Sequence, residues 1–407
     1  MTAQVRRILL GVALSSLGSG LTMPLLIVYL GKVRELGTGP AGLIVASMAV
    51  VSLVIFPIVG AASDRWGPRP VLMVGLLVEA TGVALIGVAD SLPKAVLITA
   101  VVALGSSMVW PAQSALLGRV TEPEQRERVF GIQFLLLNLG LGVGGLASAL
   151  VVSLTDVRTF QWLYLADSSS YLVYFAVMLT LGGVGVGRVL EAGHAPAGRG
   201  GYRALLSDRR LMRLQLLAVV LLACGYGALE VGTPIFITII KGLSVSWVGV
   251  SFAANTFTIV VAQLFVLRMI KGRSRSYLMA GVAGVWALSW LLLGSSLLLP
   301  AAGAITVIML SSAVFALGET VWAPVAPSLI NDLAPDHLRG RYNSSMSLVW
   351  SLSSIVGPGI AGVMLGAGLN AAWIMLLVVG CGSAGLMAVR LHAVLTPELD
   401  GRLAGGR

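Results

Sequence analysis

Four carboxyl groups lie inside long apolar stretches of this sequence. They belong to Glu79, Asp167, Glu230 and Glu319, and no Lys or Arg lies near the middle of any of these stretches. An acid at membrane depth costs a few kcal/mol and by default marks a proton relay or the path of a charged substrate. Because loss of water favours the neutral form of a carboxyl, such a group takes up a proton or holds a cation. The acids therefore predict that protons or cations bind within the membrane.

Composition and segment length show which elements must hold these acids. The 407 residues are 57% hydrophobic and only 11% charged, and the mean hydropathy is +0.94. A helix crosses the hydrocarbon core with roughly 20 apolar residues, and it satisfies its own backbone hydrogen bonds. Twelve such segments are predicted, at about residues 8–30, 41–62, 70–89, 94–117, 129–153, 160–184, 213–240, 246–268, 277–298, 301–328, 343–367 and 371–391. The expected fold class is an all-α membrane protein.

The basic residues predict how these helices are oriented. Of the 27 Lys and Arg residues, 22 lie in the tails and in the loops on one side, and five lie on the other. This bias is typical of cytoplasmic loops, so both termini are expected in the cytoplasm and the chain in the inner, or plasma, membrane. Topology and anionic lipid also account for the net charge of +10, and no nucleic-acid partner is expected.

The two halves of the chain repeat one another. "ALGSSMVWPAQSALLGRVTEPEQRERV" from Ala103 matches "ALGETVWAPVAPSLINDLAPDHLRGRY" from Ala316 at an offset of 213 residues. A polar stretch, 186–212, separates the halves, so the expected domains are six-helix bundles at 1–185 and 213–407 joined by a cytoplasmic linker. Parallel repeats of this kind build one class of secondary transporter, with the substrate site near the midplane.

A dense charge cluster lies between the second and third segments. It reads Gly60-x-x-x-Asp64-Arg65-x-Gly67-x-Arg69. The pattern resembles the signature loop of the major facilitator superfamily, and the similarity of architecture covers the whole chain. The resemblance implies a gate, in which Asp64 contacts the N-terminus of the eleventh helix and latches the outward-facing state. The corresponding loop of the second half, "RMIKGRSRS", has basic residues but no Asp.

Two further features resemble proton-coupled multidrug exporters of this superfamily with twelve transmembrane helices. Gly144 and Gly145 in the fifth segment correspond to Gly357 and Pro358 in the eleventh, and they resemble the Gly-Pro motif that exporters carry in helix 5. Here the proline is in the eleventh segment instead, and simple helix packing is an equally good interpretation. The run "ALGETVWAP" around Glu319 resembles a helix 10 that carries Gly-Glu.

These resemblances rank the acids. Glu319 is the first candidate for proton coupling and substrate binding, Glu230 the second, because glycines and Pro234 around it suggest a bending helix, and Asp167 the third, for proton coupling alone. Asp167 could instead be a satisfied polar contact between helices. Glu79 is expected to be structural or peripheral, since helix 3 lies outside the central cavity in this fold, and its role stays open. The candidate cavity wall for an amphipathic cation comprises Trp110, Gln133, Asn138, Tyr226, Asn255, Trp322 and Trp350.

Other functions fit the sequence poorly. The chain has no Walker A run, and its three histidines lack ligand spacing, so no enzyme, catalytic residue, metal site or cofactor is expected. The predicted function is a monomeric exporter that exchanges protons for small hydrophobic or cationic compounds. The alternatives are an importer or exporter of a lipid, peptide, siderophore or other metabolite and, in a different class, a membrane scaffold or sensor that transports nothing.

Overall fold

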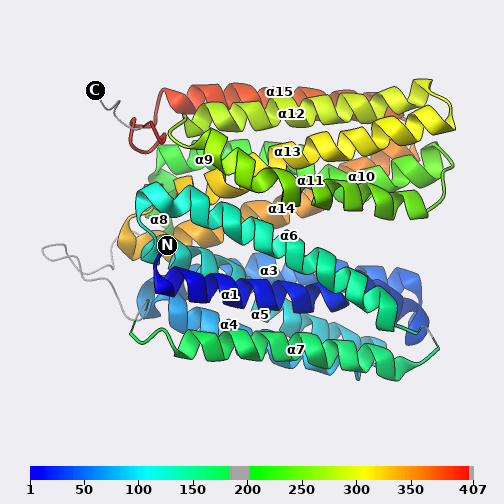
Figure 1. Cartoon of the computed structure of the whole chain (residues 1–407), viewed down its shortest axis with the longest axis horizontal. Helices are drawn as coiled ribbons and strands as arrows, with labels where there is room; N and C mark the ends of the chain where they lie inside the picture. The colour runs from blue at the N-terminus through cyan, green and yellow to red at the C-terminus, as the bar shows by residue number, and fades with distance from the viewer. Residues whose placement is uncertain (154, 184, 186–200, 403–407) are drawn as a thin grey trace, which may run out of the picture. The chain divides into compact units, whose positions relative to one another are not determined.

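The structure is a computed structural model that describes residues 1–153, 155–183, 185 and 201–402 (Figure 1). Within these ranges the chain forms helices joined by turns and loops, and no strand. Residues 186–200 of the predicted linker lie outside this set. The chain forms two compact units: the first comprises residues 1–202 and 334–348, and the second comprises 203–333 and 349–407.

The first unit is built from the N-terminal helices. They are α1 (Ala3–Thr22), α2 (Leu26–Val28), α3 (Thr38–Trp66), α4 (Pro68–Ile86), α5 (Leu92–Val120), α6 (Arg126–Val151) and α7 (Val157–Leu179). Short turns η1 (Met23–Leu25), η2 (Tyr29–Val33) and η3 (Pro123–Gln125) join some of them, and α8 (Gly201–Ser207) follows. Because η1, α2 and η2 continue α1 without a break, Ala3–Val33 is one apolar span.

The second unit is built from the C-terminal helices. They are α9 (Arg209–Leu222), α10 (Ala228–Ile235), α11 (Ser246–Ile270), α12 (Arg275–Ser295), α13 (Ala301–Leu333), α14 (Arg339–Gly366) and α15 (Asn370–His392). The π-helical turns η4 (Ala223–Gly227) and η5 (Phe236–Ile240) flank α10, and the 3₁₀ turns η6 (Ser296–Leu298) and η7 (Asp336–Leu338) precede α13 and α14. The first ten residues of α14 belong to the first unit.

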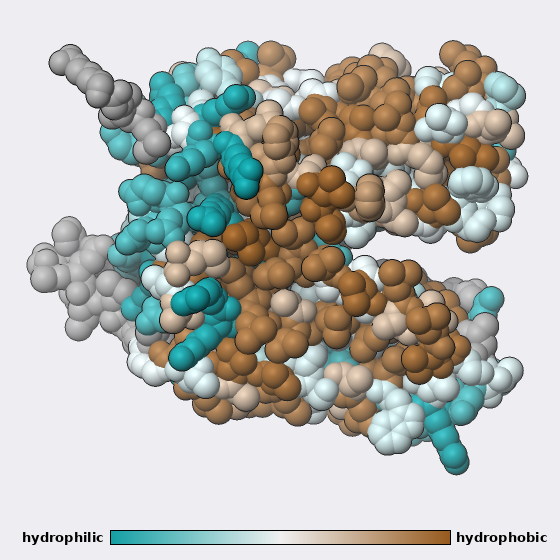
Figure 2. Space-filling model, in the orientation of Figure 1, coloured by the Kyte–Doolittle hydropathy of each residue, from teal (hydrophilic) through white to brown (hydrophobic). Residues whose placement is uncertain are grey.

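Eleven helices of the described chain are long and apolar enough to cross a membrane. The predicted sixth span, α7, is not among them although it has 23 residues. Asp167 and the three serines that follow it lower the hydropathy of α7. Hydrophobic side chains cover the flanks of the helices and hydrophilic ones gather at helix ends, as expected for a multi-pass membrane protein (Figure 2).

The two units use the same packing scheme. In the first, α4 packs on α5 and α7, α3 on α5, and α1 on α7. In the second, α12 packs on α13 and α15, α11 on α13, and α9 on α15. These four helix pairs of the second unit thus correspond to four pairs of the first. The shared scheme is that of two parallel repeats in the same chain order.

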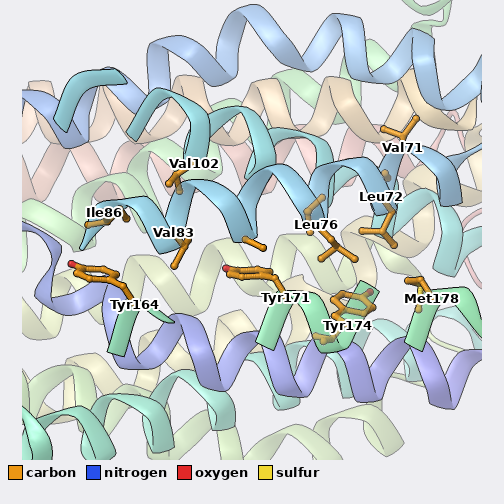
Figure 3. Close-up of a cluster of buried hydrophobic side chains, with 14 of the residues drawn as sticks. Val71, Leu72, Leu76, Val83, Ile86, Val102, Tyr164, Tyr171, Tyr174 and Met178 are labelled. Atoms are coloured by element: carbon orange, nitrogen blue, oxygen red, sulfur yellow. The ribbon is translucent and has the colours of Figure 1, made fainter. Parts of the chain in front are cut away.

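The core of the first unit lies between α4 and α7. Tyr164, Tyr171, Tyr174 and Met178 of α7 point toward α4, and all are buried (Figure 3). The Tyr174 hydroxyl donates to Oε1 of Gln113, 2.9 Å away on α5. Aromatic side chains fill this interior because they bury a large area and keep one polar group that can find a partner.

Candidate functional site

Glu319 lies in α13 with its side chain inside the second unit, where the residue is only 4% exposed. Nδ2 of Asn255, on α11, donates to Oε2 of Glu319 at 2.5 Å. The hydroxyl of Tyr226, in η4, also interacts with this carboxyl. The side chains that contact Glu319 among the described residues are therefore neutral, which leaves the acid able to bind a proton or to pair with an incoming cation.

A close helix contact sets the orientation of Glu319. A Cβ at the adjacent Gly318 would lie 2.6 Å from Cδ1 of Trp286 on α12, so only glycine allows this approach. The Trp286 ring stacks on Phe315 at 4.6 Å between centroids, and its Nε1 donates to the Phe315 carbonyl at 3.0 Å. Because α13 is held against α12 on this side, Glu319 projects toward Asn255 on α11.

Aromatic rings lie beside the Glu319 carboxyl. The Tyr226 ring contacts Trp350 at 4.6 Å and Trp286 at 5.3 Å between centroids. Trp350 is 40% exposed, whereas Trp322, about one turn beyond Glu319 on α13, is buried. Of the predicted cavity-wall residues, Asn255 and Tyr226 thus contact Glu319 directly, and Trp350 contacts the Tyr226 ring.

Glu230 lies in α10, one turn after Tyr226, and acts on it electrostatically. It is exposed in the structure, unlike Glu319. The helix that carries it is irregular, as the glycines around it suggested, because π-helical turns precede and follow α10. Such turns mark places where a helix deviates from regular hydrogen bonding, and they are frequent at functional sites.

The remaining predicted wall residues belong to the first unit. Trp110 on α5 is 49% exposed, and Gln133 on α6 is partly buried. Nδ2 of Asn138 donates to the carbonyl of Phe134 in its own helix, 3.0 Å away. The Trp110 ring is therefore exposed on the surface of α5. The Asn138 amide nitrogen donates one hydrogen bond within its own helix.

Asp167 and Glu79 are both buried inside the first unit, and Asp167 acts on Glu79 electrostatically. Asp167 on α7 is 1% exposed, and Thr22 of α1 donates to its Oδ2 at 2.5 Å. Glu79 on α4 is 7% exposed. Its carboxyl interacts with the Tyr171 hydroxyl. Glu79 is thus buried where α4 packs against α5 and α7, and the expectation that its role is structural or peripheral stays a prediction.

The repeated glycines bring equivalent helices together in each unit. A Cβ at Gly144 of α6 would lie 2.9 Å from Cα of Gly20 on α1, whereas one at Gly145 would make ordinary contact. A Cβ at Gly357 of α14, the residue before Pro358, would lie 2.6 Å from Cα of Gly227 in η4. The glycines at offset 213 therefore allow the same close approach of the fifth helix to the first and of the eleventh to the seventh.

The signature loop binds the start of α14. Oδ1 of Asp64 accepts a hydrogen bond from the Gly340 backbone N–H at 2.7 Å, and Oδ2 pairs with Nη1 of Arg341 at 3.0 Å. A Cβ at Gly60 would lie 2.9 Å from Cα of Arg341, so α3 and α14 touch closely here. A carboxylate at a helix N-terminus is stabilised by the free N–H groups and the helix dipole. Tyr202 reinforces the contact, since its ring lies 5.5 Å from the Arg341 guanidinium.

The other residues of the loop hold the turn between α3 and α4. Gly67 has φ +91°, a conformation that favours glycine. The Arg69 side chain is buried, and its Nε and Nη2 donate to the carbonyls of Met178 and Leu179 at the end of α7, at 3.1 and 3.4 Å. Arg65 is exposed and lies over the Trp66 ring at 5.8 Å. Asp64 and Arg69 thus tie this turn to two different helices.

In the second unit, the corresponding loop between α11 and α12 is bound by Asp400, a residue that was not predicted from the sequence. Asp400, in the segment after α15, is fully buried and accepts hydrogen bonds from the Ser274 and Ser276 hydroxyls at 2.6 Å. Nδ1 of His392 lies 2.9 Å from its Oδ2. The backbone carbonyl of Asp400 accepts a hydrogen bond from the Arg275 backbone N–H at 2.8 Å. In the first unit, the backbone carbonyl of Gly185 accepts from the Arg69 backbone N–H in the same way. The signal in the sequence is a loop without a carboxylate and a short tail that carries two, Glu398 and Asp400.

The described residues show no cluster of His, Cys, Asp and Glu that could hold a metal ion. Within these ranges, no three or more His, Cys, Asp or Glu side chains gather as metal ligands would. The two cysteines, Cys224 and Cys381, are free thiols.

Comparisons with known proteins agree with this architecture. Residues 8–299 match the family model of the Major Facilitator Superfamily. The chain is 22% identical to the quinolone resistance protein NorA of Staphylococcus aureus, covering 96% of this chain and 97% of that protein. It is 28% identical to the multidrug resistance protein MdtH of Aeromonas hydrophila over 73% of this chain and 71% of that one. Its fold is similar to the crystal structure of a bacterial homologue of the iron transporter ferroportin, with TM-score 0.81 and 13% identity over 96% of this chain and all of that one. The chain belongs to the major facilitator superfamily of membrane transporters.

Proposed function

We propose that the protein exports small hydrophobic or cationic compounds from the cytoplasm in exchange for protons, by alternating access. The single observation that carries this proposal is the buried Glu319 carboxyl, whose contacts with Asn255 and Tyr226 are with neutral groups. An unpaired charge in such a place is costly, so binding of a proton and binding of a cationic compound compete for the same group. That competition is what an antiporter requires.

The surroundings of Glu319 favour an amphipathic substrate. The rings of Tyr226, Trp350 and Trp286 provide flat apolar surface and attract cations through their faces. Trp322 is proposed to contact substrate in the second unit, and Trp110, Gln133 and Asn138 are proposed to do so in the first. The similarity to quinolone and multidrug resistance proteins favours drug-like cargo over other metabolites.

Glu230 would supply a second proton site beside Tyr226. It lies one turn from that ring on an irregular helix, where exposure gives it access to protons. Asp167 would be a further proton site in the first unit. In this scheme the protein works as a monomer in the inner membrane with both termini in the cytoplasm.

The signature loop would act as a gate. Its contact with α14 consists of the Asp64 carboxylate with the Gly340 N–H and Arg341, and of the close approach at Gly60, so loss of a few polar contacts would release it. Gly67 and Arg69 would hold the turn in place while Asp64 releases α14. The glycine contacts of Gly144 and Gly357 would let helices slide as the transporter changes state.

Transport in proteoliposomes with an imposed pH gradient tests the proposal. The purified protein should accumulate a fluorescent hydrophobic cation such as ethidium when the gradient is present, and Glu319→Gln should abolish this while the protein stays folded. Asp90→Asn is the matched control, because Asp90 is an exposed acid paired with Lys94. Accumulation that ignores the gradient would indicate a different transporter, and absence of flux for a broad compound panel would indicate a scaffold or sensor; either result refutes the proposal.

A further inference from the structure

A small cavity lies within the first unit. It holds about 50 Å³ and is lined by polar side chains from α1, α4, α5 and α7, by the ring of Trp110 and by the apolar side chains of Val12, Val109 and Leu137. The polar lining residues are Ser15, Ser16, Ser19, Glu79, Gln113 and Tyr171. One water needs about 10–15 Å³ measured in this way, so the space suits a few waters or one partly hydrated ion.

Glu79 is the charged group of this cavity. It is 93% buried, since its exposed fraction is 7%, and its Oε2 has no hydrogen-bond partner among the described residues. The Tyr171 hydroxyl interacts with Glu79 and lies 2.8 Å from Oγ of Ser19. A buried carboxylate with an unused oxygen is costly unless something outside the protein chain completes its contacts.

A second acid raises this cost. Asp167 acts on Glu79 electrostatically, and its Oδ1 also lacks a partner, while its Oδ2 accepts from Thr22. The titratable groups that act on Glu79 within the described residues are Asp167 and Tyr171, and neither is a cation. Two neighbouring carboxylates in a low dielectric do not both stay charged unless a cation lies with them.

The chemistry of the lining selects the ion. Carboxylate, hydroxyl and amide oxygens are hard ligands, which suit alkali and alkaline-earth cations rather than transition metals. A calcium ion takes 6–8 oxygens and usually several carboxylates, more than two acids supply. Drug-sized ligands need pockets of about 300–1,000 Å³, far larger than this cavity. A small monovalent ion is the class that fits.

We propose that Glu79, supported by Asp167 and the hydroxyls of Ser19 and Tyr171, forms a binding site for a monovalent inorganic cation of the size of Na⁺ or Li⁺. The site is separate from Glu319, so it goes beyond the proposed function and stands even if Glu319 carries no protons. The approach of α1 and α5 shapes it. A Cβ at Gly105 would lie 2.6 Å from Cα of Glu79, and one at Gly18 would lie 2.5 Å from Oδ1 of Asp167.

Binding of radioactive sodium ion to the purified full chain in detergent tests this proposal. We expect saturable binding of about one ion per chain near pH 8, with choline chloride replacing sodium chloride as the background, and displacement by protons at about pH 5. Glu79→Gln should weaken binding at least about tenfold, which is about 1.4 kcal/mol. Glu319→Gln removes the same chemical group from the second unit and should leave sodium binding unchanged.

The outcomes separate this proposal from the proposed function. Sodium binding no higher than the choline background, or equal binding by wild type and Glu79→Gln, overturns the cation site whatever the transport assay shows. Loss of gradient-driven export in Glu319→Gln with intact sodium binding supports both proposals. Should Glu79→Gln fail to fold, thermal stabilisation of the wild type by sodium but not by choline supports the site, and its absence overturns it.

Discussion

The contact between Gly340 and the signature loop makes a quantitative prediction. A Cβ at Gly340 would lie 2.6 Å from Cβ of Ser63, 2.7 Å from the carbonyl oxygen of Gly60 and 2.8 Å from Oδ1 of Asp64. All three distances are shorter than real Cβ contacts, and one neighbour is backbone, so Gly340→Ala must push α3 and α14 apart. Overpacking of this kind costs about 1–3 kcal/mol. The gain of Ala over Gly in a helix is about 0.5–1 kcal/mol at most, so a net loss of about 1–2 kcal/mol is expected.

Thermal unfolding in detergent, compared with a matched variant, checks this value. Gly362→Ala makes the same substitution in the same helix, where a Cβ would meet nothing within 4 Å. For a chain of 407 residues, an unfolding entropy of about 2.1 cal/mol/K per residue gives a Tm shift of roughly 1 °C per kcal/mol. Gly340→Ala should therefore lower Tm by roughly 1–2 °C, while Gly362→Ala leaves it unchanged or raises it. Equal Tm values for the two variants would refute the close contact. Gly340→Ala should also change the rate of transport, since the same contact forms the proposed gate.

Two further predictions concern the turns at the starts of α4 and α12. Burial raises the pKa of the Asp400 carboxyl, but hydrogen bonds from Ser274 and Ser276 outweigh burial and lower the pKa below its usual value. Because the pKa of Asp400 is lower in the folded protein than in the unfolded chain, the carboxylate stabilises the fold above the unfolded-state pKa of about 4, and this stabilisation is lost as the pH falls through the folded-state pKa. The Tm difference between wild type and Asp400→Asn should therefore shrink in acid. A difference that stays constant with pH would show that the hydrogen bonds from Ser274 and Ser276 do not lower this pKa. Arg69→Ala should lower the free energy of unfolding by about 1–3 kcal/mol, measured by thermal melting in detergent, because the carbonyls at the end of α7 lose their hydrogen-bond donor. Arg65 is exposed, so Arg65→Ala should change this free energy by no more than about 0.5 kcal/mol. Equal losses for the two variants would show that Arg69 does not hold α7.

The spans and the family could be predicted from the sequence because they depend on local properties. A membrane helix satisfies its hydrogen bonds within one segment, so hydropathy alone located the spans, and eleven of the twelve pass a simple test of length and apolarity. The exception, α7, carries Asp167 and three serines near its middle. The signature loop and the offset of 213 residues led to the major facilitator superfamily, which the family comparison confirmed.

The surroundings of the acids could not be predicted in this way, because each depends on how a helix is rotated. Hydropathy treats Glu79, Glu230 and Glu319 alike. In the structure Glu319 and Glu79 are buried whereas Glu230 is exposed. Gly318 against Trp286 and Gly105 against Glu79 fix these rotations, and such contacts join residues about thirty positions apart.

The sequence by itself determined that this chain is a membrane transporter of duplicated helices, since apolar length, charge bias and repeated motifs are readable residue by residue. Only the tertiary structure decided which groups meet: Asn255 with Glu319, Glu79 with Tyr171, and Asp400 with a loop more than a hundred residues earlier. The physical reason is that a buried polar group is stabilised by whichever partner the packing brings within about 3 Å. Packing of side chains from distant segments, and not the period of one segment, selects that partner.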